Sequence, residues 1–213
     1  DTGVGLFKKN TVALKPGVTV LIGCNGIGKS TFMKNIEENL KKENIPVMHF
    51  DNLTEGGSNA RSECCYTGDF DFMATSMCSS EGENIVLNTI KLAGKIGGFI
   101  KTGIYDTRTN RFAKAFAAGL GRNTEEEKVV SNERWILLDA VDSGLSVDNI
   151  VDLKEALFKT ILEFNDDKEI YIIVSANEYE MANGEACFDV CHGEYLTFKN
   201  YEEYRQFILD SRK

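Results

Sequence analysis

A glycine-rich run that joins an apolar segment to a helix-like segment holds the residues with the most recognisable chemistry. It follows the apolar residues 18–22 and reads Gly23-Cys24-Asn25-Gly26-Ile27-Gly28-Lys29-Ser30-Thr31. A glycine-rich turn in this setting points successive backbone N–H groups inward at the positive end of a helix dipole, which makes a cup for a phosphate group. Lys29 adds a charge that reaches the β and γ phosphates of a nucleotide, and the Ser30 hydroxyl can ligate Mg²⁺. The sequence therefore predicts nucleotide-binding residues at Asn25, Gly26, Ile27, Gly28, Lys29, Ser30 and Thr31.

A second carboxylate is needed to hold the magnesium ion of such a site, and it normally follows a buried strand. Asp139 comes directly after the four consecutive apolar residues of 135–138. Such a run is typical of a strand that is buried on both faces of a parallel sheet. We therefore expect Asp139 and Ser30 to hold Mg²⁺ together.

Strand-like and helix-like segments alternate around these residues. The strand-like runs are 18–22, 46–50, 134–138 and 169–175. Apolar residues at helical spacing follow the first of these runs, at 32–40, and the third, at 150–164. Ser146 or Asp148 can cap the second of these helices. This alternation indicates an α/β fold, with a mostly parallel central sheet flanked by helices.

The two ends of the sequence predict a small antiparallel β part. Residues 187–191 and 194–198 flank His192-Gly193 as a hairpin, and residues 6–14 alternate loosely, like an antiparallel strand. A final helix carries apolar residues from Tyr201 to Ile208.

The remaining segments indicate one domain over residues 1–213. Residues 53–80 and 102–131 are the least regular parts, and we expect a helical region over about 53–131 within that domain. The chain has no Pro-rich linker, no internal repeat and no sustained heptad pattern.

Composition narrows the class of protein. No apolar run approaches the roughly 20 residues that a bilayer span needs, so no membrane interaction is expected. The net charge of −9 opposes general binding to nucleic acid, which would need a local basic patch or a partner protein. One of the six cysteines lies in the phosphate loop and no leader follows Asp1, so we expect reduced thiols and a cytoplasmic location.

Four segments, taken in order, resemble the motifs of ABC-type ATPases. The run from Asn25 to Thr31 is the form of phosphate loop seen in that family, and residues 79–83 resemble the signature motif that contacts the nucleotide of the opposite subunit. Residues 137–146 resemble a Walker B strand that continues into a D-loop, and residues 188–204 resemble the closing hairpin and helix. The resemblance implies ATP and Mg²⁺ as cofactors. It also implies an ATP-dependent homodimer, in which Ser80, Gly82 and Glu83 of one subunit face the phosphate loop of the other.

Within this class, the sequence is similar to one branch more than to the others. The Asp139-Ala140-Val141-Asp142 form, and the lack of a transporter-coupling sequence, resemble the chromosome-maintenance and recombination ATPases. Their long coiled-coil arms are absent. The chain is most similar to small single-domain ATP-binding proteins of bacteriophages and mobile elements, which implies a role in DNA metabolism.

Three positions depart from the family pattern. Ala140 stands where the family has the glutamate that polarises the attacking water, which puts hydrolysis in question. The single glutamine, Gln206, lies far from the second strand, so Asp51 or Asn52 is the candidate to sense Mg²⁺ and the γ-phosphate. Asn177 stands in the segment where the family has its switch histidine, and it can donate a hydrogen bond but cannot carry a proton.

Asp142 is the candidate to replace the missing catalytic base. It lies three residues beyond Asp139 on the same strand-to-loop turn. The alternative is that its carboxylate caps the turn or crosses a dimer interface. Glu178 and Glu83 are further candidates. Because phosphoryl transfer is mostly positioning and charge stabilisation, loss of the base slows the reaction without abolishing it.

The sequence leaves other functions open. Ala140 favours a non-hydrolysing ATP sensor whose dimer recruits a partner, and a transporter nucleotide-binding subunit or a P-loop kinase is a further alternative. A nucleic-acid patch is another hypothesis, against which a solvated helix face is the alternative. The residues of that patch are Lys101, Tyr105, Arg108, Arg111, Phe112, Lys114 and Arg122.

Overall fold

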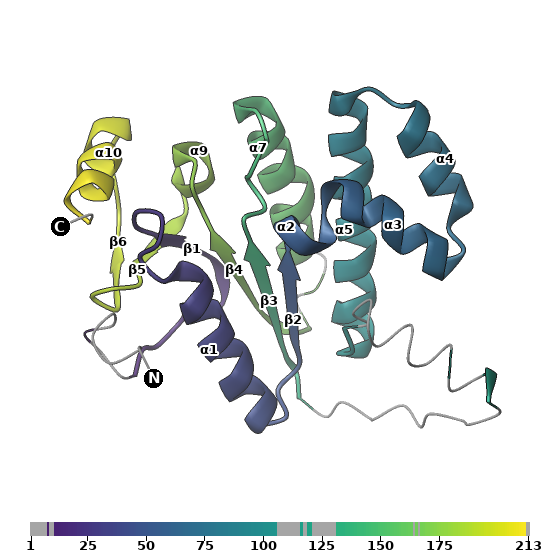
Figure 1. The fold of residues 1–213 in the computed structure, drawn as a ribbon. Helices are drawn as coiled ribbons and strands as arrows, with labels where there is room; N and C mark the ends of the chain where they lie inside the picture. Colours follow the sequence, from purple (N-terminus) through teal and green to yellow (C-terminus); the bar gives the residue numbers. More distant parts are fainter. Residues whose placement is uncertain are drawn as a thin grey trace. The chain divides into compact units, whose positions relative to one another are not determined.

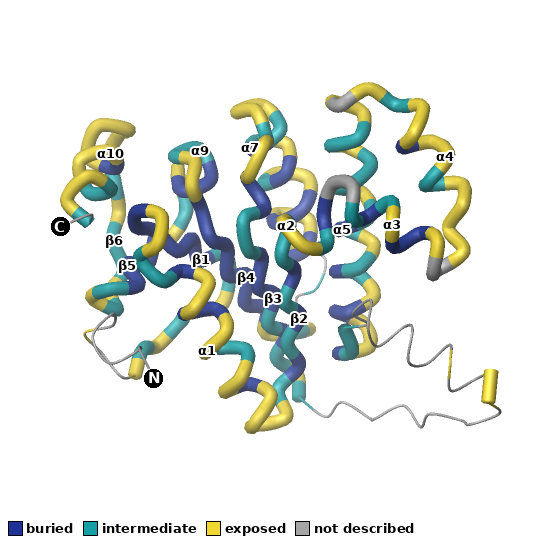
Figure 2. The backbone as a smooth tube through the Cα atoms, viewed as in Figure 1, coloured by how far each residue is buried: buried dark blue, intermediate teal, exposed yellow. Residues whose placement is uncertain are grey.

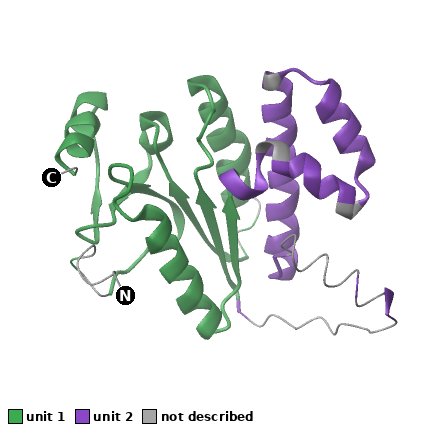
Figure 3. Ribbon diagram, viewed as in Figure 1, with its two compact units in different colours: residues 1–52, 132–213 green, residues 53–131 purple. Residues whose placement is uncertain are grey.

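The computed structural model describes residues 8, 11–105, 116, 119–120, 131–163, 165 and 167–211. The chain divides into two compact units (Figure 3). The first unit comprises residues 1–52 and 132–213, and the second comprises residues 53–131.

A six-stranded sheet forms the centre of the first unit, with the strand order β2-β3-β4-β1-β5-β6 among the described residues (Figure 1). The pairs from β2 to β5 are parallel, and β6 is antiparallel to β5. The strands are β1 (Gly17–Ile22), β2 (Val47–Asp51), β3 (Glu133–Asp139), β4 (Glu169–Ser175), β5 (Ala186–Asp189) and β6 (Glu194–Leu196). The expected α/β class, with a mostly parallel sheet and a small antiparallel part, is confirmed.

The helices of the first unit lie on both faces of the sheet. The connection from β1 to β2 through α1 runs along the sheet in the opposite direction to the connection from β3 to β4. Because crossovers between parallel strands are right-handed, the two connections lie on opposite faces, as Figure 1 shows for α1 and α7. The helices are α1 (Lys29–Lys42), α7 (Val147–Leu153), the π-helix η1 (Lys154–Lys159), α8 (Thr160–Glu163), α9 (Tyr179–Ala182) and α10 (Tyr201–Asp210).

The core follows the alternation of side chains along the strands. Odd-numbered residues of β1, β3 and β4 pack under α1, and the central strands are buried along most of their length (Figure 2). The buried residues of this cluster are Leu21, Phe32, Met33, Leu137, Ile173, Phe188 and Val190. The same alternation places Asp139 and Ser175 on the α1 side, at the carboxyl ends of their strands.

The second unit is helical. It is built from α2 (Asn52–Glu55), whose first residue belongs to the first unit, α3 (Gly57–Thr67), α4 (Phe70–Cys78) and α5 (Glu81–Thr102). Residues 53–80, which are among the least regular parts of the sequence, are thus largely helical. The helices there are short and lack a continuous apolar stripe, so they are defined by their ends: Asp69 caps α4 and Gly68 ends α3 with a φ of 75°.

Ion pairs join the helices of the second unit. The Lys95 ammonium lies 3.1 Å from a Glu63 carboxylate oxygen and 3.6 Å from one of Glu55. Burial lowers the pKa of Lys95, while the charge on Glu55 opposes that shift. Tyr105 donates a 2.7 Å hydrogen bond to Glu55. These contacts tie α2 and α3 to α5, and α2 to Tyr105 beyond the end of α5.

Several elements differ in detail from the sequence interpretation. Residues 11–14 form no strand, and residues 6, 7, 9 and 10 of the expected 6–14 strand lie outside the described residues. The strand expected at 187–191 ends at Asp189, whose carboxylate accepts backbone hydrogen bonds from the turn that follows. The helix with the apolar stripe 150–164 begins at Val147, directly after the expected cap residue Ser146, but its middle turns are π-helical. No helix within the described ranges has the length and apolarity to cross a membrane.

Helix α1 is fixed to strand β2 by a histidine–glutamate pair. Nδ1 of His49 lies 2.6 Å from Glu37, which also pairs with Lys41 at 2.5 Å. The hydrogen bond with His49, with a smaller contribution from Lys41, lowers the pKa of Glu37 from 4.5 to about 2, against the effect of burial. The ionised form of Glu37 therefore stabilises the folded state.

We expect Glu37→Gln to remove a pH-dependent part of the stability. Because the folded-state pKa is lower than the unfolded one, the contribution is complete above pH 4.5 and is lost as the pH falls toward 2. The shift corresponds to about 3 kcal/mol. Denaturant unfolding at neutral and acid pH should show a smaller acid loss in Glu37→Gln than in the wild type. The exposed neighbour Glu38→Gln is the control, and an unchanged acid loss in Glu37→Gln would contradict the assignment.

Candidate functional site

The loop between β1 and α1 has the backbone geometry of a phosphate cup. Gly23, Gly26 and Gly28 have φ values of 132°, 83° and 106°, which residues with a Cβ rarely adopt. A Cβ on Gly23 would also lie 2.9 Å from the Ile27 side chain. Gly28 immediately precedes α1 and caps it without a side chain, so the N–H groups of the first turn are open to a ligand. The loop can therefore hold a phosphate group at the positive end of the helix.

Lys29 is buried inside this loop. Its ammonium donates to the carbonyl of Gly23 at 2.7 Å and to that of Cys24 at 3.4 Å. Burial lowers the pKa of Lys29, while the charges of Cys24, Asp142 and Asp139 act in the opposite direction. The side chain thus has carbonyl partners that a phosphate can replace, and the two sequence-predicted aspartates are near enough for their charge to act on it.

Asp139 is held in place by a serine of the next strand. Ser175 donates to the Asp139 carboxylate at 2.5 Å, and its hydroxyl accepts a 2.9 Å hydrogen bond from the Ala140 N–H. Parallel pairing puts Leu138 beside Val174, so the next residues along each strand meet at the sheet edge. In the sequence, Ser175 is only the last residue of the strand-like run 169–175. The signal that identifies it is a hydroxyl in register with the acidic residue of the neighbouring strand.

The other expected magnesium ligands lie at the same edge or at the loop. Asp51 ends β2 and is the direct register partner of Asp139. Ser30 is exposed in the first turn of α1. The Asn52 amide donates to the Ala140 carbonyl at 3.2 Å, so this candidate for the missing glutamine contacts the turn after β3. Within the described ranges no group of three or more His, Cys, Asp or Glu forms a metal site, but Mg²⁺ keeps several waters and needs few protein ligands.

Ala140 has a left-handed backbone conformation, with a φ of 53°. Such a φ costs a residue with a Cβ roughly 1 kcal/mol or more, and it persists only where the surroundings impose it. Here the Ala140 N–H and carbonyl are both fixed, by Ser175 and Asn52. The position where the resemblance implies a glutamate is therefore a constrained turn with a methyl side chain.

Asp142 is buried, with 1% of its surface exposed. One carboxylate oxygen, Oδ2, accepts hydrogen bonds from the N–H groups of Asn177 at 2.7 Å and Glu178 at 2.9 Å. The other oxygen, Oδ1, has no hydrogen-bond partner among the described residues. Asp142 thus ties the turn after β3 to the segment after β4 and keeps one acceptor for a ligand or a water molecule.

Asn177 and Glu178 are exposed at the carboxyl end of β4. The backbone of both residues is fixed by Asp142, which leaves their side chains at the surface of the first unit. Asn177, Lys29, Asp139 and Asp142 all belong to this unit, and the structure brings their elements to one edge of its sheet.

Cys24 contacts the C-terminal end of α10 instead of the cup. Its N–H donates to the Ser211 hydroxyl at 3.0 Å, and its thiol donates to the Ser211 carbonyl at 3.3 Å. The loop is therefore braced from outside by a residue 187 positions away. Nothing in the local sequence indicates this contact. All six cysteines are free thiols, as the sequence suggests.

The signature-like residues form the beginning of α5 in the second unit. Ser80 is the N-cap and Glu83 completes a capping box, in which the Ser80 N–H donates to the Glu83 carboxylate at 2.7 Å. This hydrogen bond lowers the pKa of the exposed Glu83. With this cap, α5 begins at Glu81. Ser80, Gly82 and Glu83 are all exposed.

The residues of the suggested nucleic-acid patch are largely beyond the described ranges. Arg108, Arg111, Phe112, Lys114 and Arg122 lie outside them. Lys101 is exposed near the end of α5.

Comparison with known proteins gives one family match. The family model described as MukB N-terminal matches residues 3–68, about a third of the chain, which include the whole phosphate loop. No curated protein matches the sequence. Among solved structures, one titled as a nucleotide-free ATP-binding cassette from an ABC transporter is similar at 14% identity, with a TM-score of 0.37, over 93% of this chain and 86% of that one. The strand order and the helices on both faces of the sheet themselves define the α/β fold.

We expect Asp142→Ala to destabilise the first unit by roughly 2 kcal/mol, because two backbone N–H groups lose their acceptor. Asp142→Asn keeps one acceptor oxygen and should lose less. Urea unfolding measures both changes, with the exposed Asp152→Ala on α7 as the control. Equal stability of Asp142→Ala and the wild type would show that these hydrogen bonds contribute nothing to the fold.

Proposed function

We propose that this chain is an ABC-type ATPase that binds ATP, dimerises around Mg-ATP and hydrolyses it slowly, in the DNA metabolism of a phage or mobile element. The observation that carries the proposal is the pairing of a positive-φ glycine loop with Asp139, which Ser175 holds at the end of a neighbouring strand. Backbone N–H groups, a buried lysine and a fixed carboxylate are the parts that a triphosphate with its metal ion requires.

Mg²⁺ fits the oxygen donors at this edge of the sheet. The Ser30 hydroxyl and the carboxylates of Asp139 and Asp51 would hold the ion, and hard oxygen ligands are those that Mg²⁺ prefers. When bound, the ion would neutralise charge on the β and γ phosphates.

The catalytic roles follow from the contacts of each side chain. Lys29 would exchange its loop carbonyls for phosphate oxygens, and Asn177 would donate a hydrogen bond to the γ-phosphate. Asp142 would accept a proton from the attacking water at Oδ1, since Oδ2 is occupied by two N–H groups. Because Ala140 supplies no carboxylate, hydrolysis is expected to be slow.

Dimerisation would place the N-terminus of α5 against the nucleotide of the other subunit. Ser80, Gly82 and Glu83 are exposed at that helix end, where N–H groups and the helix dipole favour an anion.

The Ala140 position also favours a second function: a switch that dimerises on ATP and recruits a partner without hydrolysis. The two functions differ in turnover. DNA would change the rate of ATP hydrolysis either by binding the chain directly or through a partner protein. The rate is therefore measured with and without DNA.

We expect Lys29→Ala to lower ATP affinity at least tenfold, because the buried ammonium is the main positive side chain of the cup. Titration calorimetry with Mg-ATP measures this. Lys34→Ala, an exposed lysine on the same helix, is the matched control. Wild-type affinity in Lys29→Ala would contradict the site. Turnover above background that is lost in both Lys29→Ala and Asp142→Asn would exclude the non-hydrolysing switch, and turnover retained in Asp142→Asn would exclude Asp142 as the base.

We expect Gly82→Leu to remain monomeric in saturating Mg-ATP while the wild type dimerises, because the added side chain would occupy space needed by the other subunit's nucleotide. The substitution is tolerated within the chain, since a Cβ at Gly82 meets no atom within 4 Å. Gly94→Leu makes the same change at an exposed, open position roughly 18 Å along the same helix and should dimerise normally. Light scattering after size exclusion gives the mass. A monomeric wild type would end the dimer model.

A further inference from the structure

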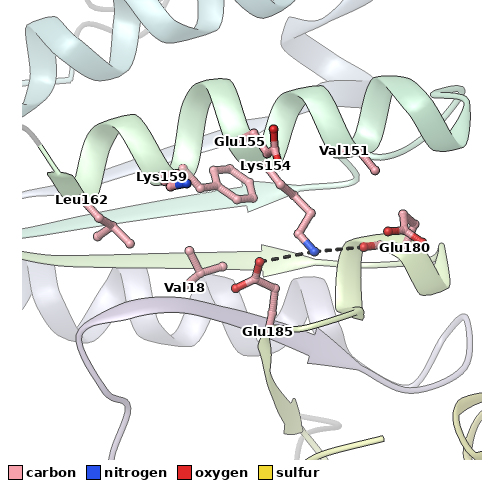
Figure 4. A pocket seen from close by; sticks show the side chains of 9 residues that line it. Val18, Val151, Lys154, Glu155, Lys159, Leu162, Glu180 and Glu185 are labelled. Carbon is pink, nitrogen blue, oxygen red and sulfur yellow. Dashed lines mark hydrogen bonds and ion pairs between the residues drawn. The ribbon is translucent and has the colours of Figure 1, made fainter. Parts of the chain in front are cut away.

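A groove with an apolar floor lies on the face of the first unit opposite α1 (Figure 4). Its volume is about 420 Å³, and Val18, Val151, Phe158 and Leu162 contribute the apolar lining. In Figure 4 the helical run from Val151 to Leu162 forms one wall, and Val18 of β1 lies opposite Leu162.

The groove exists because the connections on this face differ in length. The run α7–η1–α8 joins β3 to β4 and covers those strands. The connection from β4 to β5 runs in the same direction along the sheet, so it lies on the same face, but its helix α9 has only four residues. A helix of that length extends about 6 Å, against about 20 Å for the strand β1. The amino-terminal half of β1, with Val18, therefore stays uncovered by α9.

The wall of the groove contains a π-helical segment, Lys154–Lys159. Such segments are rare and occur frequently at functional sites. Lys154, Glu155, Phe158 and Lys159 of this segment all line the groove.

A second hollow continues the groove toward the amino ends of the strands. Its volume is about 480 Å³, it shares Leu162 with the first, and its lining includes Gly17, Asp167 and Glu169. The wall from Val151 to Leu162 alone is about 16 Å long, which corresponds to about three turns of a helix. The two hollows together offer room for an extended or helical segment of a protein.

Ion pairs neutralise part of the charge around the groove. The Lys154 ammonium lies 3.3 Å from Glu185 and donates to the carbonyls of Glu180 at 3.1 Å and Asn183 at 2.6 Å. Lys168 pairs with Asp167 at 2.6 Å.

Beyond these two pairs the lining is acidic. Its remaining charged residues are the three carboxylates Glu155, Glu169 and Glu180 and the single ammonium of Lys159. The rim is therefore acidic and the floor apolar.

We propose that this groove binds a basic amphipathic helix of a partner protein. The apolar stripe of such a helix would cover Val151, Phe158 and Leu162, and its basic residues would face Glu155 and Glu180. A second copy of the chain is a poorer match in charge, since each copy carries a net charge of −9. Binding here needs no nucleotide, so it is independent of the function proposed above.

The test uses a fluorescein-labelled leucine–lysine peptide of about 14 residues, which is roughly 21 Å long as a helix. Its leucines recur at helical spacing, and a scrambled peptide of the same composition lacks the stripe. Fluorescence anisotropy at physiological salt should show binding of the amphipathic peptide to the full chain. The double variant Glu155→Lys/Glu180→Lys should weaken it at least about tenfold, and Leu162→Asp should weaken it similarly.

Glu38→Lys/Glu202→Lys makes the same change in charge at exposed positions on α1 and α10 and should change the affinity less than about twofold. Circular dichroism checks that each variant is folded. Equal binding of the scrambled peptide, or unchanged binding by both groove variants, would overturn the proposal. Light scattering that shows self-association lost in the groove variants and kept in the control would identify the occupant as a second copy and overturn it as well.

Discussion

The parallel pairing of β3 with β4 and of β4 with β1 is the constraint on which the rest of the site depends. It brings the carboxyl ends of three strands to one edge, where β1 ends in the glycine loop, β3 in Asp139 and β4 in Ser175. A one-residue shift in the register would turn each of these side chains to the other face of the sheet. The hydrogen bond between Ser175 and Asp139 exists only in the observed register.

Helix α9 is fixed at both ends by side chains from elsewhere in the first unit. Asp142 binds the N–H groups of Asn177 and Glu178 just before the helix, and Lys154 binds the carbonyls of Glu180 and Asn183 toward its end. A four-residue helix has little stability of its own, because forming the first hydrogen-bonded turn of a helix is unfavourable in free energy. Its position therefore depends on these contacts, and it joins the candidate nucleotide site to the groove on the opposite face from α1.

Local sequence is enough to explain why several elements form, without reference to any function. The Ser80-x-x-Glu83 spacing makes a capping box, so the helix beginning at Glu81 follows from backbone hydrogen bonding alone. The resemblance of this segment to a signature motif is compatible with that role, because a capped helix N-terminus is also a site for an anion. In the same way Asp142 has two roles. Its Oδ2 joins two segments of the first unit by accepting backbone hydrogen bonds, and its Oδ1 is left to accept a hydrogen bond from a ligand or a water molecule.

The sequence by itself determined the parts that depend on short-range pattern. The strands with consecutive apolar residues, the glycine loop before Lys29 and the acidic residue after Leu138 could all be read directly, because burial and turn geometry restrict residue types over a few positions. The helices of residues 52–78 could not, since no continuous apolar stripe defines them. Only the tertiary structure decided that Ser175 holds Asp139, that Ser211 braces Cys24 and that Asp142 reaches Asn177 and Glu178. Those contacts join residues 35 to 187 positions apart, and strand order and register, which bring distant residues together, are set by the packing of the whole unit.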